Sequence, residues 1–164
     1  MTNKEFFVKT IQAERPVFLR VINAVPEAKA DWKPHEKGRP ARHVAMQLAY
    51  QPIFILGILK GSPDFSGYKD DEPMTMKEIV ALAEKNWAEL DKKITAVPDA
   101  EWEKGKTKLE FPGGKWETEK YDMAWDFLFD GIHHRGQLTT YLRAMGEKVP
   151  SVYGGSADER PTVV

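Results

Sequence analysis

The chain has 164 residues, a formal net charge of −1, 41% hydrophobic residues, 30% charged residues and no cysteine. These values are typical of one globular domain, which we expect to span residues 1–164. The lack of cysteine excludes disulfides, thiolate nucleophiles and cysteine-based metal sites. The near-neutral charge argues against a nucleic-acid partner. The start of the chain does not resemble a secretory signal, and the longest apolar run, 53–59, is too short to span a membrane. We expect a soluble, cytoplasmic protein.

Two amphipathic helices are predicted in the first third of the chain. The first covers about 2–24, where the apolar residues follow helical spacing, and Pro16 should kink or divide it. After a linker dense in turn-forming residues, Pro40 suits the first position of a second helix. That helix runs to about residue 59, with a bend expected at Pro52.

The second half of the chain predicts two more helices with a hairpin between them. Thr75 and Glu78 form a capping-box pattern that begins the third helix, which closes before Pro98. Alternating residues on both sides of a glycine turn predict a small β-hairpin over 106–120. The last helix covers about 121–145. We therefore expect an all-α fold, a four-helix bundle with a small β-hairpin inserted before the last helix.

Asp130 and His134 carry the clearest chemical signal. They are four residues apart on the last predicted helix, so their side chains share one face. Apolar neighbours on that face suggest that the pair points toward the bundle interior, where each polar group needs a partner. A bound metal is one such partner, because bundle cores commonly hold metals between facing helices. The simpler interpretation is a buried hydrogen bond in which Asp130 orients His134.

The residues around this pair allow further expectations. His133 points about 100° away around the helix and should face solvent, a neighbouring helix or a second subunit. Arg135 is interpreted as a salt-bridging or dimer-facing residue, and Gly136 as a point of close approach by another helix, a ligand or a backbone segment. Trp116, on the hairpin, could overhang a cleft.

The second helix offers two candidates that could face the pair across the bundle. His43 and Gln47 are four residues apart, so they also lie one above the other. Gln47 falls within the apolar stripe of the helix, and His43 lies slightly off it.

The end of the chain resembles a known family. The run from His133 to Arg143, HHRGQLTTYLR, is followed by Gly146, Val149-Pro150 and Tyr153-Gly154 at distances similar to those of the DinB/YfiT-like superfamily. The linker 31–34 resembles it too. The resemblance implies a four-helix bundle, often a homodimer, that holds zinc or nickel with three histidines. Family activities include metal-dependent hydrolysis and reactions that use low-molecular-weight thiols.

This chain departs from the family pattern at two of the three histidine positions. His134 matches the last family histidine, but the position four residues earlier is Asp130, and the position aligned on the second helix is Gln47. Asp and His both bind divalent metals, whereas a glutamine carbonyl is a weaker, neutral donor. His43 could substitute, although it lies one turn, about 5.4 Å, away from Gln47.

Three functions follow as hypotheses, one of which is acid–base catalysis by the Asp130–His134 pair without a metal. Another is a metal-dependent hydrolase or thiol-dependent transferase, with a divalent metal held by Asp130, His134 and Gln47, or His43 in place of Gln47, and a small-molecule substrate or thiol as partner. The last is a metal-free binding or regulatory bundle that keeps the cleft without the three-histidine site.

Overall fold

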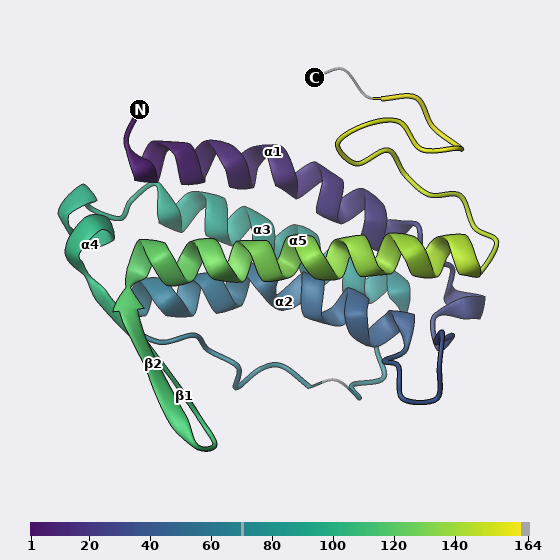
Figure 1. Cartoon of the computed structure of the whole chain (residues 1–164), viewed down its shortest axis with the longest axis horizontal. Helices are drawn as coiled ribbons and strands as arrows, with labels where there is room; N and C mark the ends of the chain where they lie inside the picture. The colour runs from purple at the N-terminus through teal and green to yellow at the C-terminus, as the bar shows by residue number, and fades with distance from the viewer. Residues whose placement is uncertain (70, 162–164) are drawn as a thin grey trace.

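The computed structural model describes residues 1–69 and 71–161. Four long helices form the bundle: α1 (Asn3–Asn23), α2 (Ala41–Lys60), α3 (Met76–Ile94) and α5 (Lys120–Ala144) (Figure 1). The connections contain a 3-10 helix η1 (Glu27–Lys29), a short helix α4 (Asp99–Lys104), and the strands β1 (Lys106–Phe111) and β2 (Gly114–Glu119). The predicted four-helix bundle with a hairpin before its last helix is thus confirmed. No described helix is both long and apolar enough to cross a membrane.

The helices do not pack in chain order. α2 packs mainly against α3 and α5, and α1 packs mainly against the same two helices, so α1 and α2 are diagonal to each other. Large side chains such as Phe18 and Trp87 fill the centre, with ring centroids 5.1 Å apart and both residues fully buried. This arrangement brings α2 and α5, which are far apart in the sequence, side by side.

Capping residues explain where the third long helix begins. The Thr75 hydroxyl accepts a hydrogen bond from the Glu78 amide at 3.3 Å, and the Glu78 carboxylate accepts one from the Thr75 amide at 2.7 Å. Two amide groups that lack partners within the helix are satisfied in this way. The predicted capping box is therefore confirmed.

The two prolines within the helices do not divide them. Pro16 lies inside α1 and Pro52 inside α2, and each helix continues for at least one turn on both sides. A proline removes one helical hydrogen bond, but both helices bury a long apolar face against the bundle, and that burial holds them together. The alternative that Pro16 splits the first segment into two helices is wrong.

The helix α4 was missed by the sequence patterns. Pro98 marks the end of the preceding segment, but its extended backbone also forms the N-cap of α4. Trp102 of α4 is fully buried, and its ring lies 5.0 Å from the ring of Phe7. One buried tryptophan therefore attaches this short helix to the bundle.

The hairpin has the predicted antiparallel pairing. Phe111 pairs with Gly114 at the tip, and Gly113 adopts a φ of 95°, which glycine adopts without strain. The ribbon projects from the end of the bundle (Figure 1). The Lys108 amide donates to the carbonyl of Gly61 at 3.0 Å, which ties β1 to the end of α2.

Candidate functional site

The pair Asp130 and His134 forms on α5 as its spacing predicts. The nearest atoms, Asp130 Oδ1 and His134 Nε2, are 3.4 Å apart. The pair does not point into the bundle core: the Asp130 side chain is 48% exposed and that of His134 is 20% exposed. The core-facing stripe of α5 passes through Gly131 and Arg135, and the residue before each of these is rotated about 100° toward the edge of the helix. The expectation of an inward-pointing pair is therefore wrong.

Gln47 of α2 reaches this pair from the neighbouring helix. Its side-chain amide nitrogen donates to Asp130 Oδ2 at 3.3 Å. Its carbonyl oxygen accepts a hydrogen bond from the guanidinium of Arg39. Because a guanidinium can only donate and a carboxylate can only accept, these two partners fix the orientation of the amide. Arg39 also donates to the Tyr68 hydroxyl at 2.6 Å.

The other ring nitrogen of His134 is engaged as well. His134 Nδ1 lies 2.9 Å from Gln137 Oε1, and the Gln137 amide nitrogen donates to the Tyr141 hydroxyl at 3.2 Å. With oxygen acceptors at both ring nitrogens, the arrangement suits a protonated imidazole. The interaction with Asp130 raises the pKa of His134 above its ordinary value, and the same interaction lowers the pKa of Asp130. Both shifts favour the charged forms, so the contact is an ion pair whenever His134 is protonated.

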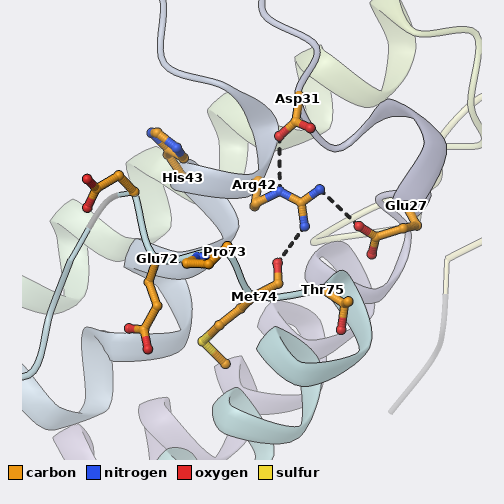
Figure 2. A pocket seen from close by; sticks show the side chains of 9 residues that line it. Glu27, Asp31, Arg42, His43, Glu72, Pro73, Met74 and Thr75 are labelled. Carbon is orange, nitrogen blue, oxygen red and sulfur yellow. Dashed lines mark hydrogen bonds and ion pairs between the residues drawn. The ribbon is translucent and has the colours of Figure 1, made fainter.

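His43 is not brought to this pair. It lines a separate cavity of about 400 Å³ beside the start of α2 (Figure 2). Arg42 lies at the centre of that cavity, where it bonds to Asp31 at 3.0 Å and to Glu27 at 2.9 Å. A third bond, 2.5 Å long, joins Arg42 to the carbonyl of Met74. These bonds tie the start of α2 to the segments before and after it.

The neighbours of the pair behave differently from one another. His133 is exposed, and its ring meets that of His134 edge-on at 5.1 Å. Arg135 is only 1% exposed and forms a buried ion pair with Glu14 of α1, so the salt bridge expected of Arg135 is confirmed. Tyr153 of the C-terminal segment covers this ion pair, because its hydroxyl donates to Glu14 at 2.8 Å and its ring stacks on the guanidinium.

Within the chain, the close approach occurs at Gly131 and not at Gly136. A Cβ atom at Gly136 would meet nothing within 4 Å, so no other helix or backbone segment of the described chain approaches it closely. At Gly131 a Cβ atom would lie 3.0 Å from the side chain of Gln51 and 3.2 Å from that of Phe18. Helix α5 therefore needs its glycine where α1 and α2 both press against it.

The three candidate ligands do not fit a divalent metal as they are arranged. The only donor atom that Gln47 could offer a metal is its carbonyl oxygen, and that atom faces the cationic group of Arg39. The amide nitrogen, which does not bind divalent metals, faces Asp130 instead. Within residues 1–69 and 71–161, no three His, Cys, Asp or Glu side chains form a group that could hold a metal ion. Asp130 and His134 alone fall short of the four ligands usual for zinc.

Beside the pair lies a cleft of about 320 Å³ between α2, α5 and the hairpin. It is lined by residues from these elements and from the loop after α2: Gln47, Phe54, Phe65, Trp116, Asp126, Phe127 and Asp130. The expectation that Trp116 borders a cleft is confirmed. The role of Asp126 was missed, although its position four residues before Asp130 could have revealed it. The aromatic lining was missed because aromatic residues at helical spacing usually indicate core packing.

The fold and site together define a class: a four-helix bundle with diagonal first and second helices and a polar site between the second and last. The chain belongs to the DinB family, whose model matches residues 1–161. No curated protein matches it.

Solved structures that share this fold include three from Bacillus species. A DinB-like protein from Bacillus cereus ATCC 10987 is 20% identical with a TM-score of 0.73, covering 91% of this chain and 97% of its own. The DinB-like protein YjoA from Bacillus subtilis is 18% identical with a TM-score of 0.68, covering 88% and 95%. YfiT from Bacillus subtilis, described as a probable metal-dependent hydrolase with an unusual four-helix bundle topology, is 16% identical with a TM-score of 0.66, covering 88% and 89%.

Proposed function

We propose that this chain is a DinB-family bundle that binds a small molecule in the cleft beside Asp130 without the help of a bound metal. The observation that carries the proposal is the direction of the Gln47 side chain. Its oxygen accepts from Arg39 and its nitrogen donates to Asp130, so the polar groups at the metal position satisfy one another. A divalent cation would have to displace Arg39 and turn the amide over.

The charges around the site support the same proposal. Arg39 lies close enough to His134 to oppose its protonation, so a positive group already stands beside the place where a metal would bind. The ion pair of Asp130 and His134 occupies the ring nitrogen and the carboxylate that a metal would need. The cleft borders this network directly, because Asp130 and Gln47 form part of its lining.

A metal-dependent hydrolase is the second candidate function. It is favoured by the description of YfiT as a probable metal-dependent hydrolase and by the contact between Asp130 and His134, two residue types that bind metals. A thiol-dependent transferase fits less well. A thiolate entering the cleft would meet two carboxylates, Asp126 and Asp130, and the described lining contains no basic side chain.

Elemental analysis separates the two candidates. Tag-free protein would be dialysed against zinc, nickel or manganese, then against metal-free buffer, and its metal content measured. The proposal predicts far less than one equivalent, and the same value for His134→Ala. One equivalent of metal in the wild type that is lost in His134→Ala would overturn the proposal and support the hydrolase.

A variant that rebuilds the family donor set serves as the positive control. The double substitution Gln47→His and Asp130→His supplies, with His134, the three histidines typical of the family. Three imidazoles facing one point make a much stronger zinc or nickel site than an amide, a carboxylate and an imidazole. We expect this variant to retain about one metal ion under conditions in which the wild type retains none.

A further inference from the structure

Three phenylalanine rings form one wall of the cleft. Phe65, from the loop after α2, lies 4.7 Å from the ring of Phe54 on α2 and 6.2 Å from that of Phe127 on α5. Phe54 and Phe127 are 6.3 Å apart and nearly perpendicular. Trp116 of β2 adds a fourth aromatic side chain from the hairpin. Four separate parts of the chain therefore contribute aromatic surface to one small volume.

The side of the cleft formed by α5 is acidic, because two carboxylates line it there. Asp126 and Asp130 are one helical turn apart, and both line the cleft. Asp130 is paired with His134, but Asp126 makes no hydrogen bond or ion pair within the described part of the chain. Partial desolvation raises the pKa of Asp126, and the nearby Asp122 adds to that effect. Asp126 is exposed to solvent, so its carboxylate is accessible to a positively charged ligand in the cleft.

These features select for a particular ligand chemistry. The face of an aromatic ring carries negative charge density and attracts cations, especially cations with an apolar surface such as alkylammonium groups. A bare metal ion gains little from such a wall, because the rings offer no oxygen or nitrogen ligands. A neutral hydrocarbon would leave Asp126 without a counter-charge. The cleft volume of about 320 Å³ lies at the small end of the range for small-molecule pockets.

We infer that the cleft of this chain binds a small organic ammonium compound, with its cationic head against Phe54, Phe65, Phe127 and Trp116 and its charge balanced by Asp126 and Asp130. This inference rests on the proposed metal-independent binding function and names the class of ligand. Only Asp126 is free to serve the ligand fully, because Asp130 shares its charge with His134.

A titration with a matched pair of probes tests the inference. Metal-free full-length protein would be titrated with choline and with its neutral carbon isostere, neohexanol, while the amide and indole NMR resonances are followed. We expect choline to shift the Trp116 indole and the amides around Phe127 in a saturable way, at least about tenfold more tightly than neohexanol. Equal or tighter binding of neohexanol at the cleft would overturn the inference and leave the metal-independent binding function standing. No saturable shift with choline would overturn it as well.

Substitutions identify the side chains that bind choline. Asp126→Asn and Phe65→Ala should each weaken choline binding several-fold, because one removes the unpaired charge and the other a ring at the cleft surface. The matched controls are Asp122→Asn and Phe129→Ala, which change the same residue types on α5 outside the cleft lining. Asp122 acts on the cleft only at a distance, through its charge near Asp126, so both controls should weaken choline binding far less than the cleft variants. Equal effects of the cleft variants and the controls would overturn the inference.

Two further measurements distinguish a free small-molecule ligand from a protein partner, and failure of the ligand class from failure of the proposed function. A peptide that carries trimethyllysine and binds more tightly than choline would show that the cleft serves a protein partner, and it would overturn the small-molecule source. The metal analysis described above is independent of these titrations. Stoichiometric metal in the wild type would therefore refute the proposed function, whereas a preference for the neutral probe would refute only the ligand class.

Discussion

The buried ion pair between Glu14 and Arg135 makes the strongest energetic prediction of this structure. Arg135 is 1% exposed, the Glu14 side chain is 9% exposed, and the guanidinium lies 4.8 Å from the ring centre of Phe18 and 4.9 Å from that of Tyr153. Replacing Glu14 with leucine leaves a positive charge buried between two helices with no counter-charge. The free energy of unfolding should fall by about 3–5 kcal/mol, and the Tm by roughly 6–20 °C for a chain of this size.

A second substitution tests whether the stranded charge is the cause. In the double variant Glu14→Leu with Arg135→Met both charges are gone, so stability should return to within about 1 kcal/mol of the wild type. The exposed pair Glu89–Lys93 supplies the control, and Glu89→Ala should cost at most about 0.5 kcal/mol. Urea unfolding followed by circular dichroism measures all four proteins. If Glu14→Leu costs no more than Glu89→Ala, or the double variant is as unstable as the single one, the reasoning fails.

Two further predictions concern α5. Because Asp130 raises the pKa of His134, the stabilising contribution of His134 is present below its unfolded pKa of about 6.5 and is lost as the pH rises through the raised value. Asp130→Asn should lower the pKa of His134 in an NMR titration and reduce that loss of stability, and an unchanged imidazole titration would contradict the ion pair. Gly131→Ala should lower the free energy of unfolding by about 1–3 kcal/mol, because its Cβ atom would lie 3.0 Å from Gln51. Gly136→Ala should instead raise it by up to about 1 kcal/mol; equal effects of the two alanines in urea unfolding would refute the packing argument.

Local patterns were sufficient to predict most of the fold. The spacing of apolar residues indicated all four long helices, the Thr75 capping box located the start of α3, and alternation around Gly113 indicated the hairpin. These signals depend on neighbours within a few residues, so the sequence displays them directly. The helix α4 was missed because its stability depends on Trp102, which is buried against α1, far away in the sequence.

The candidate site was only partly predictable for a similar reason. The contact between Asp130 and His134 follows from helical spacing, and the resemblance to the DinB family brought Gln47 to attention. The direction of the Gln47 amide is decided by Arg39 in the preceding linker, and the cleft is completed by Phe65 in a loop. No periodic pattern links these residues, since they meet only when α2 and α5 pack together.

Gln47 and Asp130 belong to one hydrogen-bond network. The Gln47 amide has a nitrogen that can donate and an oxygen that can accept. Asp130 supplies an acceptor for that nitrogen, and Arg39 supplies a donor for that oxygen. The contacts therefore form a continuous network running from Arg39 through Gln47 and Asp130 to His134. Asp130 also lines the aromatic cleft, so this network holds a carboxylate at the edge of the volume in which we propose that an organic cation binds.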